Sequence, residues 1–316
     1  LRDNTIFIFT TDNGTAAGFF EKNVTIIGET ELLVQNPQRT EFDSGEVFDL
    51  QILFNDTGQN LDIDNANISY KINNNDIGMD QDVEKLGNGL YNISIDCNGT
   101  GSYNINYGLN TIWLNASKQY FNDATTIFEF NVTAETELII EYPPQSTFYE
   151  SDESFYIQVC YNDTIKNVGI EGAEIYYSLD GGETYYDNDT PLTGGYYNIT
   201  IDCNNVDFDN YGSISIIINA SRANYHPQSE TLNIDITGKS SLIINDPTVG
   251  ASFDSDPTFN ITITCQDTAR TQGLTGATLY VLIDGNYHNY ESYHDYGDGT
   301  YQITIDANHT DLSSYG

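Results

Sequence analysis

The chain has 316 residues, more than a single hydrophobic core usually serves, so we expect two or three domains. Its 10 Lys and Arg against 47 Asp and Glu give a formal net charge of −37. A surface this acidic repels phosphate backbones and anionic lipids, which argues against nucleic acid as a partner. No apolar run approaches the roughly 20 residues of a membrane-spanning helix, so we expect no membrane span in this segment.

The composition favours an all-β fold, because Ile, Val, Phe, Tyr and Thr are frequent and Asn, Asp, Gly and Ser separate the apolar runs. Apolar and polar residues alternate within these runs, which is the pattern of strands with one buried face. In chain order, strands are predicted over 31–35, 47–54, 66–72, 90–96, 110–115 and 126–133. Turns are predicted between them, for instance at Gly87-Asn88-Gly89.

The same segments return twice along the chain. The stretch around Tyr91 is repeated around Tyr197 and again around Tyr301, at offsets of 106 and 104 residues. The stretch Thr30–Val34 returns at the same two offsets. Because independent segments agree on the period, we interpret the chain as tandem β-sandwich modules of about 105 residues.

The period predicts four segments along the chain. They are the terminal strands of a preceding or partner-completed module over 1–29, β-sandwich repeats over 30–135 and 136–239, and an incomplete repeat lacking its last two strands over 240–316. The first segment is assigned because Asn4-Thr5-Ile6-Phe7-Ile8 aligns with Asn110-Thr111-Ile112-Trp113-Leu114 at an offset of 106 residues.

Two interpretations of these complementary ends remain open. Either residues 1–29 of one copy complete the open sandwich of the next copy by β-augmentation, or the sequence is a window of a longer repeat chain. Both predict a head-to-tail array, in which the partner is another copy or an adjacent repeat, because bare strand edges are templates for aggregation.

The repeats also resemble a known family. Modules of about 100 residues with short, regularly spaced strands resemble the tandem immunoglobulin-like repeats of bacterial and archaeal surface and filament proteins. The segment Tyr176–Thr184, with its turn Asp180-Gly181-Gly182, looks like the hairpin common in such repeats. The resemblance implies an all-β, extracellular or cell-surface protein without enzymatic activity, although this architecture carries many unrelated functions.

Acceptor sequences for N-glycosylation, Asn-x-Ser/Thr, are frequent in the chain. Their asparagines are Asn13, Asn23, Asn55, Asn67, Asn92, Asn98, Asn115, Asn131, Asn162, Asn188, Asn198, Asn219, Asn260 and Asn308. Several lie between core-facing residues of a strand, as Asn92 does between Tyr91 and Ile93, so their side chains face solvent. We therefore predict covalent N-glycans, although strands rich in Asn and Thr also generate this motif without selection for sugar.

Calcium is the metal that the acidic turns favour, because hard cations bind carboxylate oxygens. The candidate ligands are Asp62, Asp64, Asp187, Asp189, Asp295 and Asp298. None of these sets has EF-hand spacing, and Asp is also preferred in turns because its side chain bonds the backbone. A role in forming the turns is therefore favoured over calcium binding. No other cofactor is expected.

The four cysteines have neither zinc-finger nor Cys-x-x-Cys spacing. Cys160 and Cys203 fall in one repeat, but alternation places Cys160 on the outer face of its strand and Cys203 on the inner face. Cys97 and Cys265 point inward, without a second cysteine in their repeats. We predict no disulfide within a module.

One segment has an enzymatic pattern. Asn4–Gly14 looks like the stretch of sulfatases that ends in a metal-binding Asp-Asn, but the nucleophile segment Cys-x-Pro-x-Arg is missing. The leading hypothesis is a structural subunit of an extracellular, glycosylated filament, stalk or surface layer. The alternative is an adhesin or carbohydrate-binding protein with the repeats as spacers, in which Tyr290 and Asp295, within 284–299, are candidate ligand residues.

Overall fold

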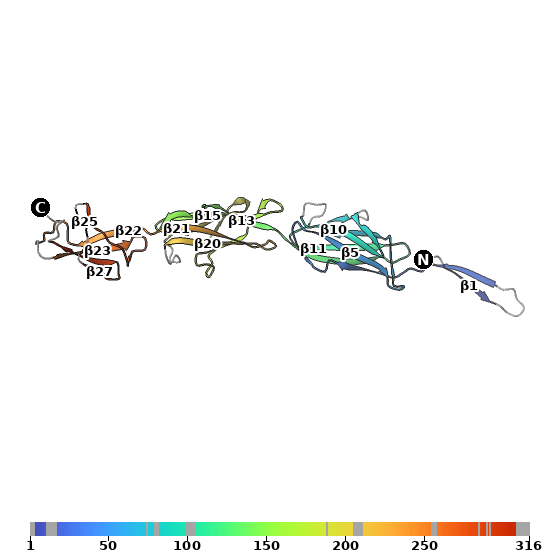
Figure 1. The fold of residues 1–316 in the computed structure, drawn as a ribbon. Coiled ribbons are helices and arrows are strands. Elements are labelled where there is room, and N and C mark those ends of the chain that lie inside the picture. Colours follow the sequence, from blue (N-terminus) through green and yellow to red (C-terminus); the bar gives the residue numbers. More distant parts are fainter. Residues whose placement is uncertain are drawn as a thin grey trace. The chain divides into compact units, whose positions relative to one another are not determined.

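The fold is built almost entirely from β-strands, as the composition predicts (Figure 1). The computed structural model describes residues 4–10, 18–73, 75–78, 82–98, 105–187, 189–204, 211–253, 258–283, 285–288, 290 and 292–307, without the side chains of 4–23, 75–78, 283, 286 and 288. In the described part of the chain, no helix is long and apolar enough to cross a membrane.

The chain divides into two compact units. The first unit comprises 1–138, 161–174 and 220–228, and the second comprises 139–160, 175–219 and 229–316. The border between the units runs through several strands, whereas the ladders that form the sandwiches keep to 30–133, 136–237 and 240–306.

The first sandwich has two sheets. Its strands are β3 (Thr30–Asn36), β4 (Glu41–Asp43), β5 (Val47–Asp56), β6 (Leu61–Asp62), β7 (Asn67–Ile72), β8 (Asn75–Gly78), β9 (Glu84–Gly87), β10 (Leu90–Asp96), β11 (Gly108–Ser117) and β12 (Ala124–Thr133). One sheet has the order β3-β5-β10-β9, with β6 on β5, and the other has the order β4-β12-β11-β7-β8. The six predicted strands are all present, with ends that differ by a few residues.

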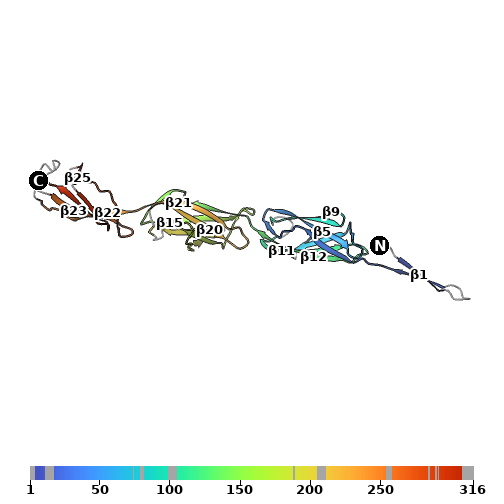
Figure 2. The same cartoon turned by 60° about the horizontal axis from the view of Figure 1, so that its bottom comes forward.

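The strand order makes this sandwich immunoglobulin-like. The first, second, fifth and fourth main strands, β3, β5, β10 and β9, form one sheet, and the third, sixth and seventh, β7, β11 and β12, form the other. The short strand β4 crosses to the second sheet and runs parallel to β12, whereas β11 and β12 lie side by side and antiparallel (Figure 2). The predicted all-β, immunoglobulin-like fold class is confirmed.

The second sandwich repeats this plan. Its strands are β13 (Thr136–Tyr142), β14 (Thr147–Glu150), β15 (Ser154–Asp163), β16 (Val168–Gly169), β17 (Glu174–Ser178), β18 (Asp189–Pro191), β19 (Tyr196–Asp202), β20 (Gly212–Ser221) and β21 (Gln228–Thr237). The two sheets have the orders β13-β15-β19-β18, with β16 on β15, and β14-β21-β20-β17. A turn of 3-10 helix, Thr193–Gly195, leads into β19.

The third sandwich has one sheet of the same order and a smaller second sheet. Its strands are β22 (Ser240–Asp246), β23 (Thr258–Asp267), β24 (Gln272–Gly273), β25 (Val281–Ile283), β26 (Asn286–His288), β27 (Ser292–Asp295) and β28 (Thr300–Asp306). The first sheet runs β22-β23-β28-β27, with β24 on β23, and the second sheet contains β25 and β26. Near the start of the chain, β1 (Asn4–Thr10) and β2 (Gly18–Val24) form a two-stranded sheet.

The repeated tyrosines anchor the cores. Tyr91, Tyr197 and Tyr301 are buried in β10, β19 and β28. The hydroxyl of Tyr91 donates a hydrogen bond to the carbonyl of Ile63 at 2.7 Å and accepts one from the N–H of Ala66 at 2.8 Å. Because a buried phenol needs polar partners, these bonds tie β10 to the connection between β6 and β7.

One core position differs between the sandwiches. Leu32 and Leu138 are each 5% exposed, but the equivalent Leu242 in β22 is 58% exposed. In the third sandwich, the described strands of the opposing sheet are β25 and β26, whereas four or five strands oppose β3 and β13. An apolar face of the third sandwich is therefore open within the described residues.

Candidate functional site at the junctions between sandwiches

The first junction joins loops of the first and second sandwiches, and its residues lie inside one compact unit. Tyr107, just before β11, donates a hydrogen bond from Oη to Oδ2 of Asp163 at 2.6 Å. Asp163 is 1% exposed, and its Oδ1 accepts the N–H groups of Ile165 and Lys166. Burial, together with the hydrogen bond to this carboxylate, raises the pKa of Tyr107 well above its ordinary range.

The ring of Tyr107 is held on both sides. Lys166 places Nζ 3.6 Å from the ring centroid, which is a cation–π contact, and Tyr225 packs edge-on with 5.4 Å between the ring centroids. These contacts combine residues that follow β15 and β20 with a residue that precedes β11. Charge, aromatic packing and a hydrogen bond therefore converge on one side chain.

Backbone hydrogen bonds cross the same junction. The N–H of Glu135 donates to Oγ of the buried Ser44 at 2.9 Å, and the N–H of Thr164 donates to the carbonyl of Glu135 at 3.0 Å. Ala134 donates to the carbonyl of Asn224 at 2.9 Å. The connection between the sandwiches is thus bonded to both of them, which restricts its movement.

The second junction, inside the other compact unit, repeats these contacts. Tyr211 donates its hydroxyl hydrogen bond to Oδ2 of Asp267, and the guanidinium carbon of Arg270 lies 4.4 Å from the centroid of the Tyr211 ring. The N–H of Lys239 donates to Oγ of Ser151 at 3.1 Å, and the N–H of Thr268 donates to the carbonyl of Lys239 at 2.9 Å.

The contacts of the second junction lower the pKa of the Asp267 carboxyl. Burial opposes its ionisation, but the hydrogen bond from Tyr211 and those from the N–H groups of Arg270 and Ala269 together lower its pKa. Burial and the bond to Asp267 raise the pKa of Tyr211. A net hydrogen bond to a charged group contributes about 1.5–3 kcal/mol, so each tyrosine–aspartate pair is a main stabilising contact of its junction.

The first sandwich carries the aspartate half of such a junction at its other end. Asp56 aligns with Asp163 and Asp267, is 4% exposed, and accepts the N–H groups of Gly58 and Gln59 through Oδ1. Together with Phe121 it lines a pocket of about 310 Å³. Among the described residues, no tyrosine hydroxyl donates to Asp56.

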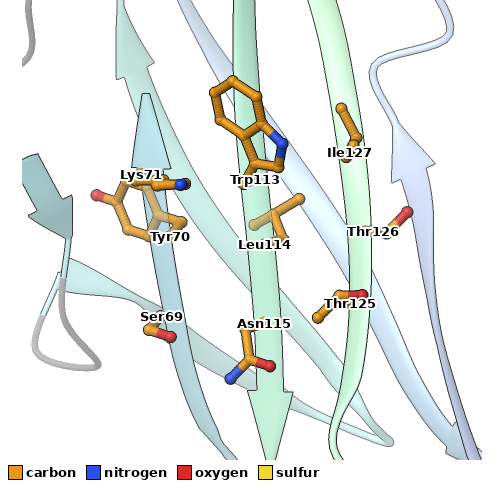
Figure 3. Close-up of a pocket in the computed structure, with 9 residues that line it drawn as sticks. All are labelled: Ser69, Tyr70, Lys71, Trp113, Leu114, Asn115, Thr125, Thr126 and Ile127. Carbon is orange, nitrogen blue, oxygen red and sulfur yellow. The ribbon is translucent and has the colours of Figure 1, made fainter. Parts of the chain in front are cut away.

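A second hollow lies on the outer face of the first sandwich. It has a volume of about 400 Å³ and is lined by side chains from β7, β11 and β12. Figure 3 shows Trp113 on the middle strand, between Lys71 on one neighbouring strand and Ile127 on the other. Lys71 Nζ lies 5.0 Å from the Trp113 ring centroid, and the predicted glycan acceptor Asn115 also lines the hollow.

The ten glycan acceptors whose side chains are described are all at least partly exposed. Asn67 and Asn260 are exposed, and Asn55, Asn92, Asn98, Asn115, Asn131, Asn162, Asn198 and Asn219 are half-buried. Asn13, Asn188 and Asn308, and the side chain of Asn23, lie outside the described part. Asn92 faces outward between buried Tyr91 and Ile93, as the alternation predicts. Glycosylation itself stays a prediction.

Three of the six calcium candidates accept hydrogen bonds from backbone N–H groups. Asp64 accepts the N–H of Gly89, Asp295 accepts those of Gly276 and Gly297, and Asp298 accepts that of Thr300. The bond from Thr300 lowers the pKa of Asp298, whereas burial and the nearby Asp187 raise the pKa of Asp189. The described side chains bring no three of Asp62, Asp64, Asp187, Asp189, Asp295 and Asp298 together as a ligand set. Calcium at these turns stays a prediction.

The four cysteines are free thiols in buried positions. Burial, with nearby Glu46 and Asp96, raises the pKa of Cys97 to about 12, and burial with Glu153 and Asp202 raises that of Cys203 to about 11. Cys97, Cys203 and Cys265 are inside, as predicted. Cys160, expected on an outer face, is also buried. The alternation within β15 therefore does not predict that other segments cover this position.

The remaining sequence candidates have structural surroundings. Asn4–Thr10 is strand β1, while Asp12 and Asn13 lie outside the described residues. Tyr290 packs beside Tyr293 with 6.0 Å between the ring centroids, and Asp295 binds turn N–H groups. Neither Tyr290 nor Asp295 lines the two hollows described above.

Comparison with protein families finds no matching family, and comparison with curated proteins finds no match. Solved structures of tandem immunoglobulin-like domains are similar in fold. A three-domain titin fragment has a TM-score of 0.44 at 11% identity, with 90% of this chain and 88% of that chain covered. A tetra-tandem repeat from the extending region of a large adhesion protein has a TM-score of 0.49 at 13% identity, covering 96% of this chain and 73% of that one. These similarities concern the fold alone.

The junction residues are not among the functional residues predicted from the sequence. The signals were Tyr-Gly at Tyr107 and Tyr211, and Asp-Thr at Asp163 and Asp267, each pair separated by 104 residues. Both signals were visible as repeats. The contact between the tyrosine and the aspartate could not be seen in the sequence, because only the folded chain brings the end of one sandwich against the start of the next.

Proposed function

We propose that this protein is a non-enzymatic structural subunit of an extracellular, glycosylated filament, stalk or surface layer, in which its modules join head-to-tail with copies of itself or with adjacent repeats of a longer chain. The single observation that carries the proposal is the tyrosine–aspartate pair, which fastens successive sandwiches at both junctions. A device used twice between neighbouring modules is suited to repeated assembly.

Asp56 is the proposed attachment point for the next copy. Its carboxylate is buried beside a pocket, in the place that Asp163 and Asp267 occupy at the junctions. The residue that aligns with Tyr107 and Tyr211 near the other end of the sequence is Tyr315, which lies outside the described residues. We propose that Tyr315 of a second copy donates its hydroxyl hydrogen bond to Asp56.

The open face of the third sandwich supports the same assembly. Leu242 is exposed there, and the β1–β2 hairpin aligns in sequence with β11 and β12, which cover the equivalent face of the first sandwich. We propose that the hairpin of a second copy supplies these strands by β-augmentation. Such cover would bury Leu242, as Leu32 and Leu138 are buried in the other two sandwiches.

Light scattering and electron microscopy of the whole chain test the assembly. We expect concentration-dependent head-to-tail arrays, weakened by Asp56→Asn and by Tyr315→Phe. The control Tyr156→Phe, at an exposed tyrosine of β15, should leave assembly unchanged. Monomers at every concentration, or arrays indifferent to both substitutions, would contradict the proposal. Intact mass before and after deglycosylation tests the glycans.

The alternative function is that of an adhesin or carbohydrate-binding surface protein. The hollow around Trp113 favours it, because an outward indole beside amide and hydroxyl groups is a surface on which a sugar ring can stack. Glycan-array binding that disappears in Trp113→Ala would support this function. Absence of glycan binding would contradict this alternative function, and that result would not affect the assembly proposal.

A further inference from the structure

Three side chains with metal-binding groups meet at the first junction. Asp43 ends β4, Glu135 lies between β12 and β13, and His226 lies between β20 and β21. Nε2 of His226 is 2.8 Å from Oδ1 of Asp43, and one ligand atom from each of the three lies within 4.8 Å of the other two. No other set of three His, Cys, Asp or Glu side chains in the described ranges meets this condition.

Hydrogen bonds from buried groups hold the three positions in place. The N–H of His226 donates to the carbonyl of Ala134 at 3.1 Å, and its carbonyl accepts the hydroxyl of buried Tyr161 at 2.6 Å. The N–H of Glu135 is bound to Oγ of Ser44, the residue that follows Asp43. The three ligands come from separate segments, and each segment is fixed before an ion arrives.

The second junction places a cation in the corresponding position. Because Ser44 corresponds to Ser151, Glu150 corresponds to Asp43, and Lys239 takes the place of Glu135. The Lys239 ammonium lies 2.7 Å from Glu150 and 2.9 Å from Asp152. The second junction thus offsets part of its carboxylate charge with its own lysine.

The first junction has no such lysine. Asp43 pairs with His226, and within the described residues neither Asp43 nor Glu135 is paired with Lys or Arg. Replacement of a lysine by a glutamate reverses the charge at this position and adds an oxygen ligand. The formal net charge of −37 also raises the local concentration of cations at the surface.

We propose that the first junction binds one divalent cation of the zinc class through Asp43, Glu135 and His226. A neutral imidazole with carboxylates is a ligand set for zinc, whereas calcium requires six to eight oxygen ligands. Ligand atoms about 2.0–2.2 Å from a zinc ion lie roughly 3–4 Å apart. Small side-chain rotations that separate Nε2 of His226 from Oδ1 of Asp43 would therefore make room for the ion. Water completes the tetrahedral coordination.

The ion would fasten the first sandwich to the second. Asp43 belongs to the first and His226 to the second, so coordination bonds would cross the junction beside the Tyr107–Asp163 hydrogen bond. A bound ion would thereby oppose separation of the two sandwiches.

Zinc titration of the whole chain by calorimetry at neutral pH tests the proposal. We expect one Zn²⁺ site, weakened by at least roughly 10-fold in His226→Gln and in Glu135→Gln, since even loss of an outer-shell partner has this effect. His294→Gln, in the third sandwich, is the matched control and should bind as the original chain does. Failure to bind Zn²⁺, equal binding by His226→Gln, or preference for Ca²⁺ would overturn the site.

Amide hydrogen exchange separates loss of the metal from loss of the fold. Zn²⁺ should slow exchange of the Thr164 N–H at the first junction and leave that of Thr268 at the second unchanged. The substitution Glu135→Lys, which copies the second junction, should abolish zinc binding while Thr164 stays protected without metal. Unprotected Thr164 in Glu135→Lys, or zinc-dependent protection of Thr268, would contradict the proposed equivalence.

Discussion

The two junctions share a plan but balance their charges differently. Both use a tyrosine that donates to a buried aspartate, with a cationic side chain over the ring and a serine that receives the N–H of the connecting residue. At the connecting residue itself, the first junction has Glu135 and the second has Lys239. The shared contacts set the geometry of each junction. The connecting residue sets the local charge, because Glu135 adds a negative charge at the first junction and Lys239 adds a positive charge at the second.

The difference extends to packing. The ring of Tyr211 lies so close to Gly238 that a Cβ there would be 2.5 Å from the ring, whereas the first junction has Ala134 at the equivalent position. The second junction is therefore tighter around its tyrosine. Equivalent residues can thus be exchanged between junctions to find which of them carry stability.

Removal of the tyrosine hydroxyls should have the largest effect. We expect Tyr107→Phe and Tyr211→Phe each to cost about 1.5–3 kcal/mol at their own junction, because each leaves a buried aspartate without its donor. Amide exchange at Thr164 and Thr268 measures the two junctions separately. Tyr120→Phe is the control, and an equal effect from it would show that the hydroxyl contact to aspartate is unimportant.

Substitution of the glycine at the second junction comes next. Gly238→Ala should cost about 1–3 kcal/mol, because the added methyl overlaps the Tyr211 ring. The reverse change in the first junction, Ala134→Gly, should cost about 1–2 kcal/mol, through backbone entropy and the loss of a buried methyl group. Exchange of the Thr268 N–H reports the first effect. A neutral Gly238→Ala would mean that the ring moves aside freely.

Alkaline pH should weaken both junctions. The pKa values of Tyr107 and Tyr211 are raised above the ordinary value of 10.0, so the folded chain keeps these protons longer than the unfolded chain does. The protonated hydroxyls of the two tyrosines therefore contribute to the free energy of unfolding in full below pH 10.0, and this contribution is lost as pH rises above it. The melting temperature should fall over this range, and less steeply in the chain carrying both Tyr→Phe changes. Parallel curves would refute this origin.

The smallest effect is expected from the lysine at the second junction. Lys239→Met removes exposed ion pairs with Glu150 and Asp152, so protection of Thr268 should fall slightly at low salt. At about 1 M salt the difference should vanish, because screening removes most of the attraction between exposed charges. A loss that persists at high salt would indicate packing by the lysine stem instead.

The strands could be predicted from the sequence because each one carries its own alternation. β5 and β10 were recognised from the spacing of their apolar residues, and the repeats fixed the approximate length of a module. The short strands β4, β8 and β9 were missed, because three or four residues contain too little periodicity. The position of Cys160 was misjudged because the cover over a strand's outer face comes from other segments.

The junctions required the fold itself. Tyr107 and Asp163 are 56 residues apart, and Asp43 and His226 are 183 residues apart, so no local pattern connects them. By itself the sequence determined the all-β class, the period, the acidic surface and the outward glycan acceptors, because those properties depend on composition, on the repeated segments and on the alternation of apolar and polar residues. Only the tertiary structure decided which side chains face each other at a junction, because those contacts form when loops distant in the chain are brought together by the packing of complete sheets.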